Sequence, residues 1–265
     1  MIRNTLVACA ALFASAAFAQ SSDRWQFSAA LNVFVPTVKA QTVFPPSGGG
    51  SAASVDGGGI LDNLETFFMG SFEARKGVWG FFTDVAYLDM SAGKSGSQDL
   101  KLGQVGLPVG ASANVNFGLK GWVWTAAGTY RLATTPKYHV DLIGGTRLLD
   151  IETKTDWTLG GNIGSVAIAD RAGARSSTLN NWDVIIGAKG RLALGADGKW
   201  FMPYYIDVGA GESKWTVQAM TGVGYAFSWG DIVGSWRYLG YEMKSGSALQ
   251  DLSFNGPMVS AVFHW

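Results

Sequence analysis

Three stretches near the C-terminus alternate between apolar and polar or small residues. In the first, every second residue from Trp215 to Phe227 is mostly apolar, and the residues between them are mostly polar or small. The second covers residues 232–241, with Arg237 on its polar face, and the third covers residues 257–265. A period of two is that of a β-strand, whose side chains point alternately to opposite surfaces. We therefore predict three strands, each with one apolar and one polar surface.

The same alternation recurs in seven earlier segments of the chain. They cover residues 24–35, 65–75, 78–89, 111–132, 138–151, 182–194 and 200–210. In the fourth of these the parity of the apolar positions changes between Leu119 and Trp122, which predicts a bulge or a part that stands clear of a membrane. Together the segments predict about ten strands, with eight or twelve as alternatives.

The connections between these segments differ sharply in length. Four are long and rich in polar residues or Gly, near residues 37–64, 91–112, 152–181 and 242–251. In the first half of the chain they alternate with tight turns. This order is typical of an antiparallel up-and-down barrel with long outer loops and short turns at the opposite end. It predicts a single all-β domain over residues 20–265.

The N-terminus has the pattern of a secretory signal peptide. A short positive start is followed by an apolar run over residues 6–18, and Ala17 and Ala19 form a cleavage site of small residues. We expect residues 1–19 to be removed after export through the Sec pathway. Because Cys9 lies inside this segment, the mature chain is expected to contain neither a disulfide nor a reactive thiol.

Charge and hydropathy narrow the class of protein. The 265-residue chain has 20 basic and 20 acidic residues, so it lacks the excess of positive charge that binding nucleic acid requires. Outside the signal segment no apolar run is long enough for a transmembrane helix. Export, alternating strands and abundant glycine favour a β-barrel that spans a membrane. A soluble periplasmic β-sandwich is the alternative.

Three C-terminal motifs resemble small bacterial outer-membrane β-barrel proteins of the OmpA-barrel and OmpW-like group. They are Gly222-Val-Gly-Tyr-Ala-Phe, Trp236-Arg-Tyr-Leu-Gly-Tyr and the terminal Val262-Phe-His-Trp265. The resemblance implies a transmembrane antiparallel up-and-down barrel. It also implies a C-terminal assembly signal, formed here by Val259, Ala261, Phe263 and Trp265, although Trp265 stands where the family usually has Phe. The implied partners are outer-membrane lipid and lipopolysaccharide, with the barrel-assembly machinery and periplasmic chaperones during biogenesis.

In such a barrel the polar side of each strand faces the lumen, because a charge against hydrocarbon costs about 2–4 kcal/mol near the midplane. The charged residues expected to face inward are Asp84, Arg131, Asp141, Arg147, Asp183, Lys189, Arg191, Asp207 and Arg237. The set contains both signs, which favours ion pairs that fill a narrow lumen. A polar conduit for small solutes is the alternative.

Aromatic residues gather near the ends of the predicted strands, where interfacial girdles lie in membrane barrels. They are Trp25, Trp79, Tyr87, Trp124, Tyr138, Trp182, Trp200, Trp229, Trp236 and Trp265. A platform that stacks sugars or bases is a poorer interpretation, because these residues are spread around the whole chain.

No arrangement of residues in the sequence predicts catalysis. The two histidines are expected at periplasmic ends of strands, His139 beside a turn and His264 beside the C-terminus. Neither has a neighbouring Ser or Asp in a triad pattern. Asp183 and Asp207 are possible paired carboxylates, but basic neighbours on the same face favour ion pairing. Ala92-Gly-Lys-Ser95 lacks the earlier glycine of a phosphate-binding loop, and no metal-binding motif is present. We expect no cofactor, no metal and no enzymatic activity.

The sequence therefore predicts an integral outer-membrane barrel of a Gram-negative bacterium with a structural, passive role and a charge-paired lumen. A narrow porin-like channel for small hydrophilic solutes is the alternative. A surface adhesin that uses the long loops, or an enzyme acting on lipid or peptide, is a weaker hypothesis.

Overall fold

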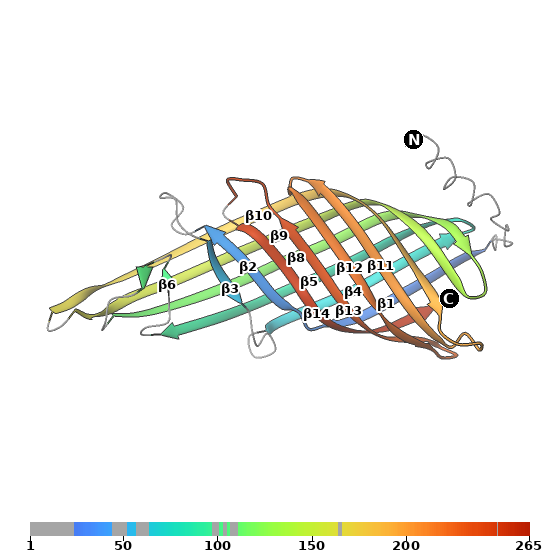
Figure 1. Cartoon of the computed structure of the whole chain (residues 1–265), viewed down its shortest axis with the longest axis horizontal. Helices are drawn as coiled ribbons and strands as arrows, with labels where there is room; N and C mark the ends of the chain where they lie inside the picture. The colour runs from blue at the N-terminus through green and yellow to red at the C-terminus, as the bar shows by residue number, and fades with distance from the viewer. Residues whose placement is uncertain are drawn as a thin grey trace, which may run out of the picture.

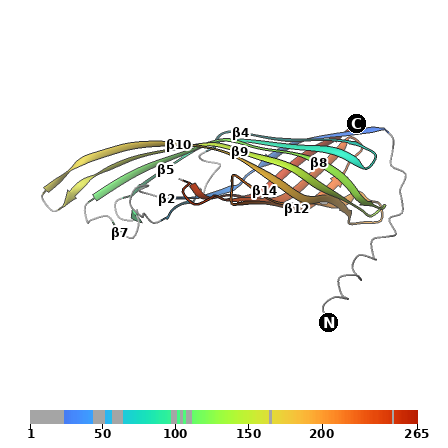
Figure 2. The same cartoon turned by 90° about the horizontal axis from the view of Figure 1, so that it is seen from above.

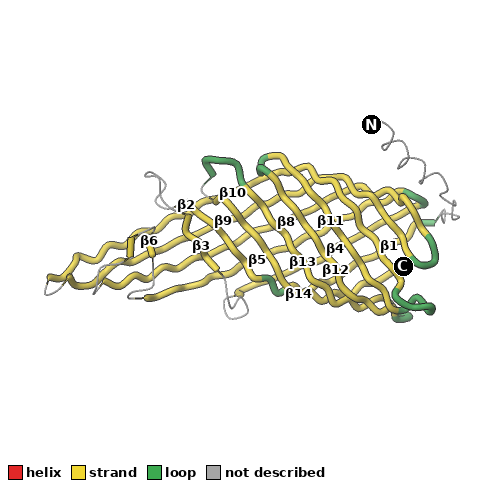
Figure 3. Tube along the Cα trace, viewed as in Figure 1, coloured by secondary structure: helices red, strands yellow, loops and turns green. Residues whose placement is uncertain are grey.

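A computed structural model describes residues 24–43, 52–56, 64–96, 101–102, 105–106, 111–163, 166–247 and 249–265. Ten strands form a closed antiparallel barrel (Figures 1 and 3): β1 Trp25–Phe34, β4 Leu64–Lys76, β5 Trp79–Gly96, β8 Ala111–Thr134, β9 Tyr138–Ile163, β10 Val166–Ala193, β11 Trp200–Gly211, β12 Trp215–Ala226, β13 Gly230–Glu242 and β14 Leu249–His264. The signal segment, with Ala17 and Ala19, lies outside the described residues.

The barrel closes between its first and last strands. β1 pairs with β14 from Ser28 opposite His264 to Phe34 opposite Met258, and each other barrel strand pairs with its neighbours in chain order. Closure leaves no free sheet edge along the paired part of the wall, which is the condition for a sheet to exist in hydrocarbon. The expected all-β, ten-strand, up-and-down barrel is confirmed.

Four strands continue far beyond the rest of the wall (Figures 1 and 2). Residues 91–96 of β5, 111–118 of β8, 152–163 of β9 and 166–181 of β10 form an extension that we call the ribbon. Residues 152–181, expected as a long loop, are therefore almost entirely strand. Polar residues occupy consecutive positions there, as at 175–178, so the pattern of hydrophobicity carries no period-two signal although the backbone pairing continues.

The other predicted loops also contain paired backbone. β2 Thr37–Val43 follows β1 after a break at Pro36 and continues along β14, and β3 Ala52–Asp56 pairs with β2. Two short strands, β6 Lys101–Leu102 and β7 Val105–Gly106, pair within the expected loop 91–112. The connection expected at 242–251 is shorter, because β13 ends at Glu242 and β14 begins at Leu249.

The outer and inner surfaces of the barrel wall differ in polarity. Large apolar side chains on the outside are widely exposed, including Leu31 at 60%, Val184 at 71% and Ile186 at 69%. Aromatic residues lie around this belt near both ends of the strands, and several pack together, such as Trp79 with Tyr130 at 4.9 Å between ring centroids. A belt of exposed aliphatic residues between aromatic groups is the outer surface of a barrel that faces lipid.

The bulge expected between Leu119 and Trp122 is wrong, whereas residues 111–118 of the same strand do extend beyond the rest of the wall (Figure 1). Leu119, Val123 and Thr125 all point inward and are buried, whereas Trp122 and Trp124 are exposed outside. The register shift in β8 lies instead between Arg131 and Ala133. The prediction failed because the lumen beside Leu119 and Val123 is itself apolar, so hydrophobicity there does not mark the outer surface. Among the described residues, no helix is long and apolar enough to cross a membrane.

Candidate functional site

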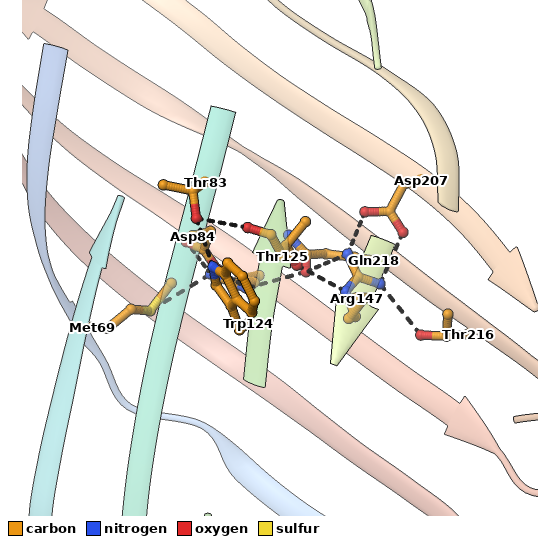
Figure 4. A network of polar contacts seen from close by, with 10 residues as sticks. Met69, Thr83, Asp84, Trp124, Thr125, Arg147, Asp207, Thr216 and Gln218 are labelled. Carbon is orange, nitrogen blue, oxygen red and sulfur yellow. Dashed lines mark hydrogen bonds and ion pairs between the residues drawn. The ribbon is translucent and has the colours of Figure 1, made fainter. Parts of the chain in front are cut away.

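The middle of the lumen is crossed by Arg147, whose side chain is fully buried. Its guanidinium group, on β9, forms a two-point ion pair with Asp207 on β11. It also donates to the Thr125 hydroxyl at 3.1 Å, the Thr216 hydroxyl at 3.3 Å and the Gln218 carbonyl oxygen at 3.1 Å (Figure 4). A buried charge is tolerated only when it is paired and hydrogen-bonded, and Arg147 meets both conditions.

A second buried pair lies beside the first. Arg237 on β13 donates to Asp84 on β5 at 2.8 and 3.3 Å, and to the same Gln218 oxygen at 3.1 Å. Gln218 therefore joins the two pairs into one layer that spans the lumen. With two arginines and two aspartates, this layer carries no net charge.

A third cluster occupies the lumen nearer the short turns. Asp141 accepts hydrogen bonds from Arg75 at 2.5 Å and from Arg131, and Arg75 also contacts Glu73 at 2.8 Å. Lys189 pairs with Glu73, and its Nζ lies 4.2 Å from the centroid of the Phe82 ring. The cluster holds three cationic and two anionic side chains.

Two more buried carboxylates, Asp231 and Asp183, lie at the two ends of this polar region. At the rim near the C-terminus, Asp231 contacts Arg191 at 3.3 Å and His264 at 3.0 Å. Toward the ribbon, Asp183 accepts a hydrogen bond from the Ser213 backbone at 2.9 Å, and its second oxygen has no partner among the described residues.

The charges in the lumen balance. The cationic side chains named above are Arg75, Arg131, Arg147, Lys189, Arg191 and Arg237; the anionic ones are Glu73, Asp84, Asp141, Asp183, Asp207 and Asp231. Six of each sign give an interior without the single-sign lining that selects ions. Among the described residues, no group of acidic, histidine or cysteine side chains is arranged to hold a metal ion.

Beyond the Arg147 layer, toward the ribbon, the lumen is filled by apolar side chains. The buried cluster includes Phe34, Met69, Leu119, Leu149, Leu239, Leu252 and Phe254. Residues of β2 take part, since Val38 and Ala40 are 3% and 2% exposed. Ion pairs thus close one part of the lumen, and apolar side chains close the other.

The structure places all nine charged residues expected in the lumen on its inner side. It joins Arg147 to Asp207, Arg237 to Asp84, and Arg131 to Asp141. Asp183 and Asp207 do not form a carboxylate pair, because each has its own partner. Sequence reasoning missed Glu73, Arg75 and Asp231, although the alternation of Glu73 and Arg75 with Phe72 and Ala74 was a usable signal.

The residues of the expected assembly signal lie on β14 beside β1. Val259, Phe263 and Trp265 are exposed on the outer surface at 56%, 42% and 63%, with Ala261 between them half-buried. The Trp265 backbone exchanges two hydrogen bonds with Phe27, at 2.9 and 3.1 Å, and the two rings stack. The final residue therefore takes part in the seam that closes the barrel.

A closed antiparallel barrel with an apolar outer belt and a polar, charge-paired lumen has the architecture of outer-membrane β-barrel proteins. No family model and no curated protein matches this chain. Among solved structures, the chain is similar to the outer membrane protease OmpT from Escherichia coli. The identity is 10% and the TM-score 0.50, and the match covers 92% of this chain and 97% of OmpT.

Two further solved structures match with lower TM-scores. The attachment invasion locus protein Ail of Yersinia pestis is 12% identical with a TM-score of 0.29, over 91% of this chain and 99% of Ail. The translocator domain of autotransporter NalP from Neisseria meningitidis is 14% identical with a TM-score of 0.37, over 93% and 90%. The expected likeness to outer-membrane barrel proteins is confirmed at the level of the fold, whereas the narrower OmpA and OmpW grouping is only approximate.

Proposed function

We propose that this protein is an integral outer-membrane barrel with a structural, passive role whose lumen does not conduct. The observation that carries the proposal is the filled interior: the layer joined by Gln218 crosses the lumen, and the apolar cluster lies beyond it. A conduit needs a continuous polar path, and buried ion pairs held by several hydrogen bonds do not readily give one.

The planar-bilayer conductance of the refolded mature chain, residues 20–265, tests this proposal. We expect no discrete conductance steps from protein whose insertion is shown by its heat-dependent electrophoretic mobility. A general porin in the same bilayer serves as the positive control. Reproducible steps from the wild-type chain would overturn the proposal and favour the narrow channel for small hydrophilic solutes.

The proposed location in a membrane can be tested separately by a substitution in β10. Val184→Lys places a charge in the exposed aliphatic belt, and we expect it to lower the free energy of unfolding in lipid vesicles by about 2–4 kcal/mol. Ser176→Lys, on the exposed surface of the ribbon in the same strand, should change it by less than about 0.5 kcal/mol. Equal effects of the two substitutions in urea titrations would argue against a lipid-facing belt.

We also propose that the protein has no catalytic activity. In support, His139 and His264 both lie at the end of the barrel that carries the short turns, and the aspartate beside His264 is shared with Arg191. The outer-membrane lipid, lipopolysaccharide, periplasmic chaperones and assembly machinery remain the proposed partners, with β14 and Trp265 as the recognised segment. Sec export of the precursor belongs to the same proposal.

A further inference from the structure

One face of the ribbon continues the inner surface of the lumen. The inward-facing positions of β9 run from Ile151 through Thr153 to Trp157, and its pairing with β10 has no register shift over this stretch. The ribbon extends from the end of the barrel opposite the last residue, Trp265 (Figure 1). Figure 2 shows it bending toward the side on which β12 and β14 lie, so this face is concave. We call it the inner face of the ribbon.

An aromatic ring is fixed on the inner face. The indole of Trp157 lies over the backbone of Gly173, its cross-strand partner in β10. A Cβ on Gly173 would meet three atoms of this ring at 3.0 Å or less, so a larger residue would displace it. Trp157 is half-buried in this position. A planar ring held on an open sheet offers a large apolar contact area at little cost in conformational entropy.

The inner face has cationic positions and no acidic ones. Arg175 is exposed there, two positions from Gly173 along β10. Arg171 has the same parity, because no register shift separates it from Arg175, and Lys94 is in register with Trp157 through β8. Among the described positions 91–96, 111–118, 152–159 and 171–181, none on the inner face is acidic.

The outer face of the same strands carries both signs. Glu152, Lys154 and Asp156 occupy successive outward positions of β9, and Lys154 forms an ion pair with Glu152 at 3.3 Å. Charge is therefore segregated between the two faces. A concave face with cationic positions beside an aromatic ring attracts an anionic partner.

We propose that the inner face of the ribbon binds an acidic polysaccharide built of uronic acids. A pyranose ring packs its C–H surface on the Trp157 indole, and sugar carboxylates accept charge-assisted hydrogen bonds from Arg175. Nucleic acid is disfavoured because its affinity depends on many phosphate contacts, and this face has only the cationic positions named above. A peptide recognised through its main chain would pair with a sheet edge and not with a sheet face. This binding is separate from the passive role proposed for the lumen.

Soluble hexamers of different chemistry test the proposal with the folded mature chain in zwitterionic detergent micelles. Hexagalacturonate has both sugar rings and carboxylates, maltohexaose has the rings alone, and hexaglutamate has the carboxylates alone. By isothermal titration calorimetry we expect saturable binding of hexagalacturonate, roughly tenfold or more tighter than that of the other two. Absence of saturable binding would overturn the proposal. Equal or tighter binding of maltohexaose, hexaglutamate or an oligonucleotide hexamer would also overturn it.

Matched charge reversals on the two faces locate the binding. Arg175→Glu, on the inner face, should weaken binding of hexagalacturonate by roughly tenfold or more. Lys154→Glu, on the outer face, should change it by less than about twofold. Equal weakening by the two variants would mean that only the overall charge matters, and would contradict the proposal.

The aromatic contact has its own pair of variants. Trp157→Ala removes the stacking surface and should weaken binding by roughly tenfold, whereas Trp157→Tyr keeps a planar ring over Gly173 and should retain most of it. Heat-dependent electrophoretic mobility shows that each variant has a folded barrel. Wild-type affinity in a folded Trp157→Ala variant would place the polysaccharide elsewhere and overturn the proposal.

Discussion

Arg147→Ala is expected to lower the free energy of unfolding by about 3–5 kcal/mol, because it leaves Asp207 buried without its cation. The substitution also removes donors to Thr125, Thr216 and Gln218, so several buried polar groups lose a partner at once. Urea titration of the refolded protein in lipid vesicles, followed by tryptophan fluorescence, measures the effect.

Two controls separate the loss of the buried charge partner from the loss of a side chain. Lys154→Ala removes a cation from an exposed ion pair with Glu152 on the ribbon, and we expect a change of less than about 1 kcal/mol. The double substitution Arg147→Met with Asp207→Leu removes both buried charges and should recover much of the lost stability. A double variant no more stable than Arg147→Ala would show that the cost does not come from the unpaired aspartate.

The fold was predictable from the sequence wherever the two surfaces of a strand meet different surroundings. In β10, Val184 and Ile186 face outward while Asp183 and Lys189 face the lumen, so the alternation is sharp. The part of the same strand before Asn181 was not predictable, because Arg175, Ser176 and Thr178 are polar and exposed without a regular apolar residue between them. The strand continues there through backbone hydrogen bonds, which do not depend on the hydrophobicity of the side chains.

The sequence predicted which charged residues face the lumen, but not which of them form ion pairs with each other. Parity along β9 and β11 is enough to place Arg147 and Asp207 inside the lumen. Their contact joins residues 60 positions apart across the barrel, so it depends on the stagger of all strands between them. The apolar part of the lumen was not predicted, for a different reason. If the lumen is assumed to be polar, inward-facing leucines such as Leu119 are wrongly predicted to face outward.

Gly145→Ala is expected to destabilise the barrel by about 1–3 kcal/mol or more, with Gly144→Ala as its matched control. A Cβ on Gly145 would lie 2.1 Å from the Ala126 carbonyl oxygen and 2.5 Å from the Ala127 Cα, so β8 and β9 would have to move apart. A Cβ on Gly144 would meet nothing within 4 Å, and its change should stay within about 0.5 kcal/mol.

The same urea titration and the yield of heat-modifiable, folded protein measure both variants. Gly145 pairs with Ala127 in β8 and Ile185 in β10, so the added methyl group disturbs the sheet at the level where Thr125 and Arg147 form their hydrogen bond. We therefore expect Gly145→Ala to be less stable than Gly144→Ala even though the two positions are adjacent. Equal stabilities would mean that the wall relaxes around the methyl group, and that close approach of these strands is not what holds the Arg147 layer together.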